Sequence, residues 1–232
     1  MATTKGNKRM RLDEAGFPAC PAGIVFDCDG VLVDTEPCWD RAEKEMFARR
    51  GARLGPEERA QLLGTSYRAT AARMAELLHE RGNEPLLLAE LVSSVAERIH
   101  DEAAAMEGAH RLVEAMLATS VPVAVASNSP RAIVDVALEA GGFGGMFGTI
   151  IAFEDVVHAK PAPDLYLEAC RQLDVPAAQS VAFEDSAPGV ASALGAGLFT
   201  ICIPSPGVEA YADLMLGTLA DPSLAAWVAT WS

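Results

Sequence analysis

Two aspartates separated by a single residue follow an apolar run near the start of the chain. Residues 24–26, Ile-Val-Phe, have the pattern of a buried strand, and Asp27 and Asp29 come directly after them. Residues two apart in an extended chain point to the same side, so the two carboxylates would be neighbours. Each could be a solvated residue at a strand end. Unpaired like charges beside apolar neighbours are costly, however, and a bound divalent cation would remove the conflict.

Three further apolar runs, all in the second half of the chain, also end in polar clusters. These clusters are Ser127-Asn128-Ser129, then Glu154, Asp155 and Lys160, then Glu184-Asp185-Ser186. Ligands of an open parallel sheet bind beyond the carboxyl ends of its strands, so we expect the clusters to share one rim with the two aspartates. Carboxylates, hydroxyls and an amine suit Mg²⁺ and a phosphoryl group. Zinc would need clustered His or Cys, which the sequence does not offer.

This set of groups can carry out phosphoryl transfer. The reaction needs a nucleophile, a proton donor for the leaving alcohol and cations that spread the charge of the phosphoryl oxygens. Single residues also have ordinary structural alternatives. Lys160 could be a solvated loop residue before a proline, and Ser127 could be the N-cap of a helix starting near Arg131. Cys28 must point away from the two acids, so it is expected to pack behind the sheet.

Short apolar strands alternate with amphipathic helices through most of the second half of the chain. We expect helices near residues 110–119, 130–142, 163–173 and 188–197, and strands near 122–127, 148–153, 180–183 and 199–204. A last short helix is expected near residues 224–227. This alternation predicts an α/β fold with a doubly wound, parallel, Rossmann-like sheet.

Residues 39–106 show helical spacing and no convincing strand. An all-helical block between two strand-bearing stretches predicts a separate helical domain inserted into the α/β one. The predicted organisation is a loose N-terminal arm at 1–20, an α/β core at 21–36 and 107–232, and an all-helical cap domain at 37–106. The hinges are expected near Asp34–Pro37 and Met106–Ala109, where Gly or Pro is close by.

The stretch DCDGVLVDTEP resembles the first motif of the haloacid dehalogenase superfamily, in its helical-cap, β-phosphoglucomutase-like branch. The resemblance implies that Asp27 is the nucleophile that forms an aspartyl-phosphate. It implies that Asp29 protonates the leaving group and later activates water. Ser127 and Asn128 resemble the second motif, whose hydroxyl and amide hold the phosphoryl oxygens, and Lys160 resembles the third-motif lysine that offsets charge on nucleophile and phosphate.

The FEDSAPGV stretch resembles the fourth motif, which binds the metal. By this resemblance Asp185 ligates Mg²⁺ with Asp27 and the backbone carbonyl of Asp29. Glu184 is either a further ligand or an acceptor behind the ligands. Gly30 of the first motif is expected beside the phosphate. Arg68, in the segment 64–68 where this branch presents substrate-contacting cap residues, could reach the substrate or could equally be a solvent-facing residue on the first turn of a helix.

The composition of the chain limits the classes of partner that it can bind. The chain has 232 residues, 50% of them hydrophobic, and a formal net charge of -14, which argues against nucleic acid, whose backbone demands basic patches. No apolar run approaches the roughly 18 residues that span a bilayer, and no apolar segment of a secretory signal follows the basic N-terminus. Five scattered cysteines without a Cys-x-x-Cys pair suit a cytoplasmic protein with reduced thiols. We expect a monomer or a weak homodimer.

The predicted function is Mg²⁺-dependent hydrolysis of a small phosphorylated metabolite, a sugar or polyol phosphate, by way of an aspartyl-phosphate. One alternative is a phosphosugar mutase of the β-phosphoglucomutase type. Where those mutases carry a histidine this chain has Trp39, and its EPCWDRAE stretch looks more like that of sugar-phosphate phosphatases. Trp39 could also be cap core. A second alternative is a regulator that binds a phosphorylated metabolite without turnover, although the complete set of acid, base and nucleophile argues against it. Dehalogenation is disfavoured because it produces no alcohol for Asp29 to protonate.

Overall fold

The computed structural model describes residues 16–62 and 67–231, and its centre is a six-stranded parallel sheet. The strand order is β3-β2-β1-β4-β5-β6. The strands are β1 (Gly23–Phe26), β2 (Val123–Ala126), β3 (Thr149–Ile151), β4 (Ser180–Glu184), β5 (Phe199–Cys202) and β6 (Leu214–Met215). The sheet is parallel throughout, which confirms the predicted fold class. The two-residue edge strand β6, in the tail, was not predicted.

Helices cover both faces of the sheet because alternate residues of each strand point to opposite sides. Ile24 and Phe26 of β1 lie in one core, with α5 (Ala109–Leu117), α6 (Arg131–Ala140) and α9 (Pro222–Val228). Val25 lies in the other core, with α7 (Asp164–Leu173) and α8 (Ala187–Ala196). Two short 3₁₀ turns, Phe153–Asp155 and Ala177–Gln179, complete the connections. Cys28 is fully buried in the first core, as predicted.

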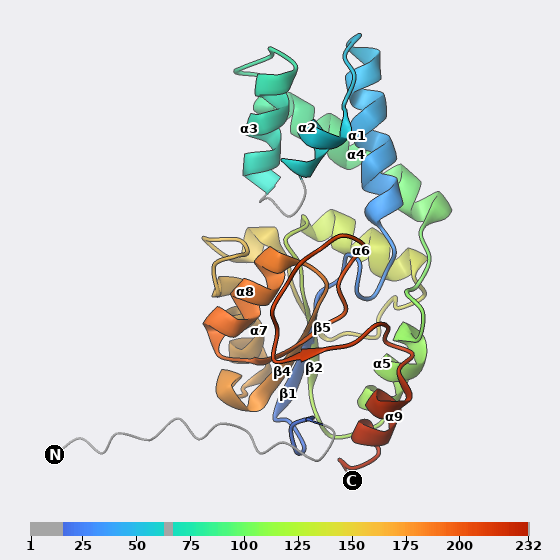
Figure 1. Cartoon of the computed structure of the whole chain (residues 1–232), viewed down its shortest axis with the longest axis vertical. Helices are drawn as coiled ribbons and strands as arrows, with labels where there is room; N and C mark the ends of the chain where they lie inside the picture. Colours follow the sequence, from blue (N-terminus) through green and yellow to red (C-terminus); the bar gives the residue numbers. More distant parts are fainter. Residues whose placement is uncertain (1–15, 63–66, 232) are drawn as a thin grey trace, which may run out of the picture.

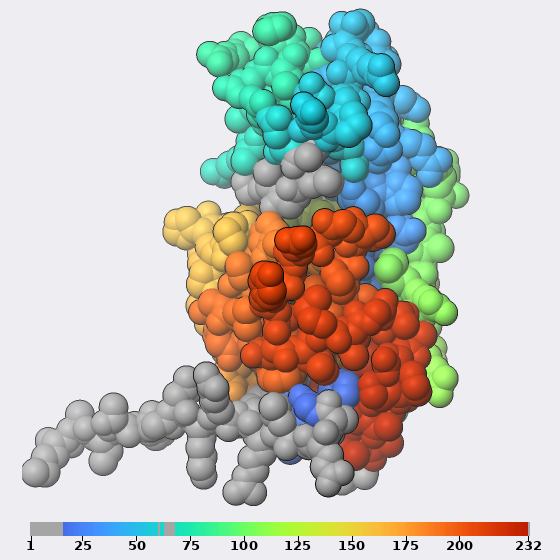
Figure 2. Space-filling view, in the orientation of Figure 1, coloured from blue at the N-terminus to red at the C-terminus, as the bar shows by residue number. Residues whose placement is uncertain are grey.

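Four helices form a second body above the carboxyl edge of the sheet (Figure 1). They are α1 (Glu36–Arg49), α2 (Pro56–Ala60), α3 (Tyr67–Leu77) and α4 (Glu84–Glu102). Their apolar faces bury Ala42, Met46, Met74, Leu87 and Leu91. These helices run from residue 36 to residue 102, and the cap bounds of 37–106 stay a prediction. Figure 2 shows this body seated over the α/β part.

The two chain crossings between cap and core lie side by side. Val33 forms isolated bridges with both Asp29 and Ala105. The backbone N–H of Asp34 donates to the carbonyl of Ala104 at 2.9 Å, and the N–H of Met106 donates to the carbonyl of Leu32 at 2.9 Å. Because the entering and leaving segments are hydrogen-bonded to each other, they can act as one hinge.

The N-terminal arm predicted at 1–20 is only partly open to comparison, because residues 1–15 lie outside the described part of the chain. Its last residues are packed, not loose. Phe17 is buried and stacks on Trp227 of α9 with 5.1 Å between ring centroids, and the indole N–H of Trp227 donates to the carbonyl of Pro18. The burial of this ring against a second aromatic ring holds the segment in place, although it forms no helix or strand. Among the helices that the structure describes, none is long and apolar enough to cross a membrane.

Candidate active site

Lys160 and Asp27 form a buried ion pair at the end of β1. The Nζ of Lys160 lies 2.5 Å from Oδ1 of Asp27 and 2.6 Å from Oε1 of Glu184, and it donates to the carbonyl of Ala126 at 2.9 Å. Only 4% of Lys160 is exposed, so it is not a solvated loop residue. Burial alone would lower the pKa of Lys160, but the carboxylates of Asp27 and Glu184 outweigh it and raise that pKa. The ammonium therefore stays charged.

Burial raises the pKa of Asp27 well above the ordinary aspartate value, while Lys160 opposes the rise and Glu184 adds to it. A carboxylate that must be ionised to act as a nucleophile thus depends on nearby positive charge. Lys160 supplies part of that charge. A cation bound beside Asp27 would supply the rest.

Glu184 is the buried acceptor behind this pair. Its Oε1 accepts hydrogen bonds from Lys160 and from the phenol of Tyr166, the latter at 2.6 Å. Its Oε2 accepts from the backbone N–H of Asp185 at 3.1 Å and from Ser186. Gly189 of α8 leaves room for it, since a Cβ there would lie 2.0 Å from the carboxylate. Both oxygens are engaged, so the geometry favours an acceptor behind the metal ligands over a direct ligand.

The donor set of the rim fits a divalent cation. Ligand atoms of Asp27, Glu184 and Asp185 all lie within 4.8 Å of one another. Burial raises the pKa of Asp185 to about 7, Glu184 adds to the rise, and the hydroxyl of Ser205, which donates at 2.5 Å, opposes it. Three buried carboxylates with one ammonium leave excess negative charge, and a hard cation with oxygen ligands would offset it.

Gly30 lets the first loop approach this cluster. Its φ is +81°, in the left-handed region, and its N–H donates to the carbonyl of Val33 at 2.8 Å. A Cβ at this position would lie 2.4 Å from Oδ2 of Asp185. Gly30 is thus required by a turn and by a close approach to Asp185. A direct phosphate contact by Gly30 stays a prediction.

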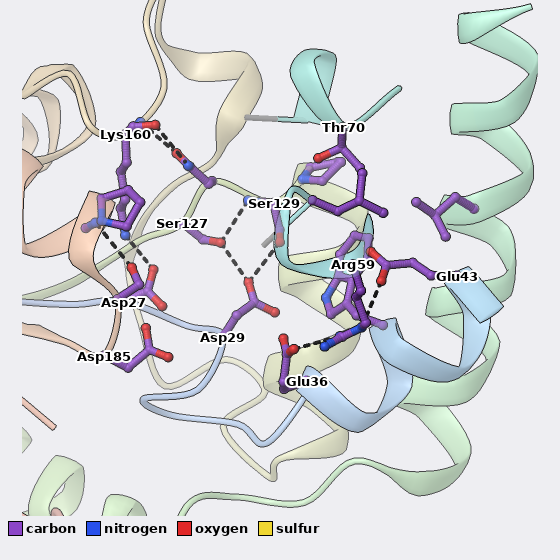
Figure 3. Close-up of a pocket in the computed structure, with 18 residues that line it drawn as sticks. Asp27, Asp29, Glu36, Glu43, Arg59, Thr70, Ser127, Ser129, Lys160 and Asp185 are labelled. Atoms are coloured by element: carbon purple, nitrogen blue, oxygen red, sulfur yellow. Dashed lines mark hydrogen bonds and ion pairs between the residues drawn. The ribbon is translucent and has the colours of Figure 1, made fainter. Parts of the chain in front are cut away.

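Three hydroxyl groups hold the carboxylate of Asp29, and Figure 3 shows the two from Ser127 and Ser129. Thr35 donates to Oδ1 at 2.6 Å, while Ser127 and Ser129 donate to Oδ2 at 3.0 and 2.8 Å. Ser127 also accepts from the backbone N–H of Ser129. The alternative role of Ser127 as a helix N-cap is wrong, because α6 has Pro130 at that position. Since Thr35 is the N-cap residue of α1, Asp29 is joined to the cap as well as to the core.

Asn128 clamps the loop that carries Lys160. Its Oδ1 accepts from the backbone N–H of Lys160 at 2.8 Å, and its Nδ2 donates to the carbonyl of the same residue at 3.3 Å. The side-chain amide is thus used to position Lys160. The predicted contact of Asn128 with a phosphoryl oxygen stays a prediction.

A pocket with a volume of about 190 Å³ opens between this cluster and the cap. From the core it is lined by Asp27, Asp29, the loop 127–130, Lys160, Asp185, Ser186, Pro188 and Gly189. From the cap it is lined by Glu36, Trp39, Glu43, Arg59, Leu62, Thr70 and Leu91. Trp39 in this wall is half-buried, and it also packs against the hydrophobic core. Phosphate chemistry at the rim would take place directly beneath a cap surface made by this chain.

Comparison with known proteins gives a family. The sequence profile of the haloacid dehalogenase-like hydrolases matches residues 24–203. The chain belongs to the haloacid dehalogenase-like hydrolase family. It is 35% identical to the protein CbbY of Rhodobacter capsulatus over 195 residues, which cover 78% of this chain and 85% of the relative. It is 29% identical to the fructose-1-phosphate phosphatase YqaB of Escherichia coli, over 76% of this chain and 93% of that protein.

A solved structure agrees with these relatives. The crystal structure of a CbbY mutant from Rhodobacter sphaeroides in complex with xylulose-1,5-bisphosphate superposes with a TM-score of 0.77, at 29% identity, and covers 87% of this chain and 96% of that one. The predicted superfamily and the prediction of a phosphatase-type enzyme are thereby confirmed.

Some predicted residues of this haloacid dehalogenase-like hydrolase lie away from the pocket. Arg68 of α3 is exposed, with its guanidinium carbon 5.7 Å from the ring centroid of Phe153 in the core, and it does not line the pocket. The rest of its predicted segment at 64–66 lies outside the described residues. Glu154 and Asp155 are exposed and accept from the backbone N–H groups of Arg131 and Ala152. These two acids hold the loop and are not part of the metal cluster.

Other residues of the site carried no sequence signal that pointed to them individually. Thr35, Ser129, Tyr166 and Ser205 each donate to one of the four central carboxylates. Thr35 and Ser129 stand next to residues that the motifs had marked. Tyr166 reaches the site from α7, and Ser205 reaches it from the loop after β5. Only the three-dimensional structure reveals these two contacts.

Proposed function

We propose that this chain hydrolyses phosphomonoesters of sugars or polyols in two steps, with Asp27 as nucleophile and Asp29 as general acid and base. The observation that carries the proposal is the juxtaposition of two differently held aspartates in one pocket. Asp27 is buried and paired with Lys160, whereas Asp29 is held by three hydroxyl groups. Two carboxylates in such different environments suit two different chemical roles.

In the first step a carboxylate oxygen of Asp27 forms a bond to phosphorus as the bond from phosphorus to the ester oxygen breaks. Asp29 gives its proton to the leaving alkoxide, which departs as the alcohol. In the second step Asp29 takes a proton from water, whose oxygen attacks phosphorus. Inorganic phosphate leaves and Asp27 is restored. Lys160 stabilises the charge on the phosphoryl oxygens, and the Ser127 hydroxyl is proposed to turn from Asp29 to the phosphoryl group when substrate binds.

Mg²⁺ is the proposed cofactor, held by Asp27, Asp185 and the backbone carbonyl of Asp29, with Glu184 behind them. When bound it supplies positive charge that keeps Asp27 ionised and neutralises the phosphoryl group. The carboxylates of Asp27, Glu184 and Asp185, whose ligand atoms lie within 4.8 Å of one another, suit such an ion. The cap is proposed to close over the rim and exclude water during the first transfer.

The substrate class rests on the relatives and on the size of the pocket. YqaB is named a fructose-1-phosphate phosphatase, and the CbbY structure was solved with a sugar bisphosphate. A pocket of about 190 Å³ with carboxylates, a guanidinium and an indole in its wall suits a small hydroxylated molecule. All five cysteines are free, four of them buried, which supports a cytoplasmic location.

The test is phosphate release from a panel of sugar, polyol and nucleotide monophosphates, with Mg²⁺ and with EDTA. We expect stoichiometric phosphate from a sugar or polyol phosphate, no release with EDTA, and none from Asp27→Asn. The same reactions are examined for isomerised product with a bisphosphate activator. Isomerised sugar phosphate with little free phosphate would show a mutase, and binding without turnover would show a regulator.

A further inference from the structure

On the cap side of the pocket, the guanidinium of an arginine lies among three carboxylates. Arg59 of α2 lies 2.7 Å from Oε1 of Glu36, 2.7 Å from Oδ1 of Asp40 and 3.2 Å from Oε2 of Glu43. Figure 3 shows Arg59 between Glu36 and Glu43, across the pocket from Asp27 and Asp29. Glu36, Glu43 and Arg59 all line the pocket. Arg59 thus faces three carboxylates, two of which, those of Glu36 and Glu43, belong to the pocket wall.

Glu43 is the buried member of the group. It is 5% exposed, although a carboxylate on a cap helix could have faced solvent. Its Oε2 and the Nε of Arg59 form an ion pair whose geometry is not that of a hydrogen bond, and neither atom has a hydrogen-bond partner among the described residues. A buried, incompletely satisfied carboxylate in a pocket wall is a binding group for a ligand that can donate hydrogen bonds.

Arg59 is badly placed to serve a second phosphoryl group. Its Nη2 and Nε already face Glu36, Asp40 and Glu43. A phosphate dianion would have to displace one of these carboxylates and then lie next to the others. Hydroxyl or ammonium groups of a ligand would meet no such repulsion, because both donate to carboxylates. The remaining wall residues, Trp39, Leu62, Thr70 and Leu91, add no charge.

We infer that Glu43, together with Glu36 and Arg59, is a specificity determinant that accepts an uncharged or cationic leaving group and rejects one that carries a second phosphoryl group. The substrate is thus a monophosphate of a polyol, sugar or amino sugar. The inference rests on the proposed function, whose site it extends to the leaving-group end. It sets this chain apart from the CbbY structure that holds xylulose-1,5-bisphosphate.

The experiment compares matched substrates. For wild-type protein with Mg²⁺, kcat/KM is measured on glucose 6-phosphate, glucosamine 6-phosphate and glucose 1,6-bisphosphate. We expect the bisphosphate to be at least about tenfold poorer than the two monophosphates, since like charges across an interface are strongly disfavoured. In Glu43→Gln the kcat/KM for the bisphosphate should rise about fivefold or more relative to that for glucose 6-phosphate. The kcat/KM for glucosamine 6-phosphate should fall relative to that for glucose 6-phosphate.

Glu45→Gln is the matched control. Glu45 lies on the same helix and pairs with an arginine, Arg98 at 2.6 Å, but it is exposed and does not line the pocket. Its substrate ratios should equal those of wild type. If Glu43→Gln fails to fold, Glu36→Gln takes its place, because Glu36 lines the same wall from an exposed position.

Two readouts separate this inference from the proposed function. Hydrolysis of p-nitrophenyl phosphate, absent in Asp27→Asn, tests the chemistry alone. Calorimetric Kd values of the Asp27→Asn protein for the mono- and bisphosphate test the wall without turnover. Failure to release phosphate from any ester would overturn the proposed function, and the Kd ratio would still decide the inference. A bisphosphate that binds or reacts as well as the monophosphate, or a ratio that Glu43→Gln and Glu45→Gln change alike, would overturn the inference alone.

Discussion

Replacing Lys160 with methionine removes the positive charge between two buried carboxylates while keeping most of the side-chain volume. Lys160 is 4% exposed and bonded to both Asp27 and Glu184. Removing one partner of a buried ion pair costs about 3–5 kcal/mol, because the other charge is left buried and unpaired. Domains of this kind are stable by only about 5–15 kcal/mol. Lys160→Met should therefore lose a large part of the free energy of unfolding, measured in urea at neutral pH without metal.

A double-variant cycle gives this prediction its control. Glu184→Gln removes one of the carboxylates that Lys160 neutralises, so Lys160→Met with Glu184→Gln should be less destabilised than the sum of the single variants, by about 1 kcal/mol or more. Lys44→Met, which removes an exposed lysine paired with Asp40, should cost less than about 1 kcal/mol. Phosphate release by Lys160→Met should fall about 10²–10³-fold, the usual effect of losing one group that stabilises transition-state charge. Strict additivity, or stability of Lys160→Met within about 1 kcal/mol of wild type, would refute the reasoning.

Three further predictions concern Gly30, Thr35 and the cap residue Glu43. Gly30→Ala should abolish phosphate release and weaken Mg²⁺ binding measured by calorimetry, since its Cβ would lie 2.4 Å from Asp185 Oδ2 and its φ is +81°; retained metal affinity would contradict this. Thr35→Val should lower kcat by about tenfold with little change in Mg²⁺ affinity, since it removes one hydroxyl from Asp29, and equal losses in both would show that this separation of roles is wrong. Glu43→Gln should flatten the pH dependence of Tm. Burial raises the pKa of Glu43 to about 7, so the folded protein binds the proton of this carboxyl more tightly than the unfolded chain does. The wild-type protein therefore loses this stability as the pH rises through about 7, whereas the glutamine variant has no such proton to lose. Parallel Tm profiles for the two proteins between the ordinary glutamate pKa and pH 8 would count against it.

The rim of the sheet could be predicted from sequence because the rule behind it is topological. Apolar runs that end in Asp27, Ser127 and Glu184 become parallel strands, and parallel strands end at one edge. The alternation of strands and helices likewise predicted that helices would pack on both faces of the sheet. Lys160 could be predicted by the same reasoning, because its loop lies in the connection that follows β3, after the short turn Phe153–Asp155.

The cap wall could not be predicted in the same way. Glu36, Glu43 and Arg59 lie on helices whose spacing shows which face is apolar but not which residues of two helices meet. Arg68, chosen for its position in the chain, lies over Phe153 instead. Tyr166 and Ser205 reach the site from α7 and from beyond β5, at sequence distances that no local pattern spans. Phe17 packs on Trp227 for the same reason, by a long-range apolar contact.

The most direct test of the account is to identify the residue that carries the phosphoryl group. Protein with Mg²⁺ is mixed with a sugar monophosphate that it hydrolyses, quenched in acid within one turnover and reduced with borohydride, which converts an aspartyl-phosphate to homoserine. We predict homoserine at position 27 in the peptide mass spectrum and none in Asp27→Asn. With p-nitrophenyl phosphate, whose leaving group departs without a proton, Asp29→Ala should give more homoserine, because its second step lacks a base. Homoserine at another acidic residue, or phosphate release with no reducible intermediate at any quench time, would contradict it.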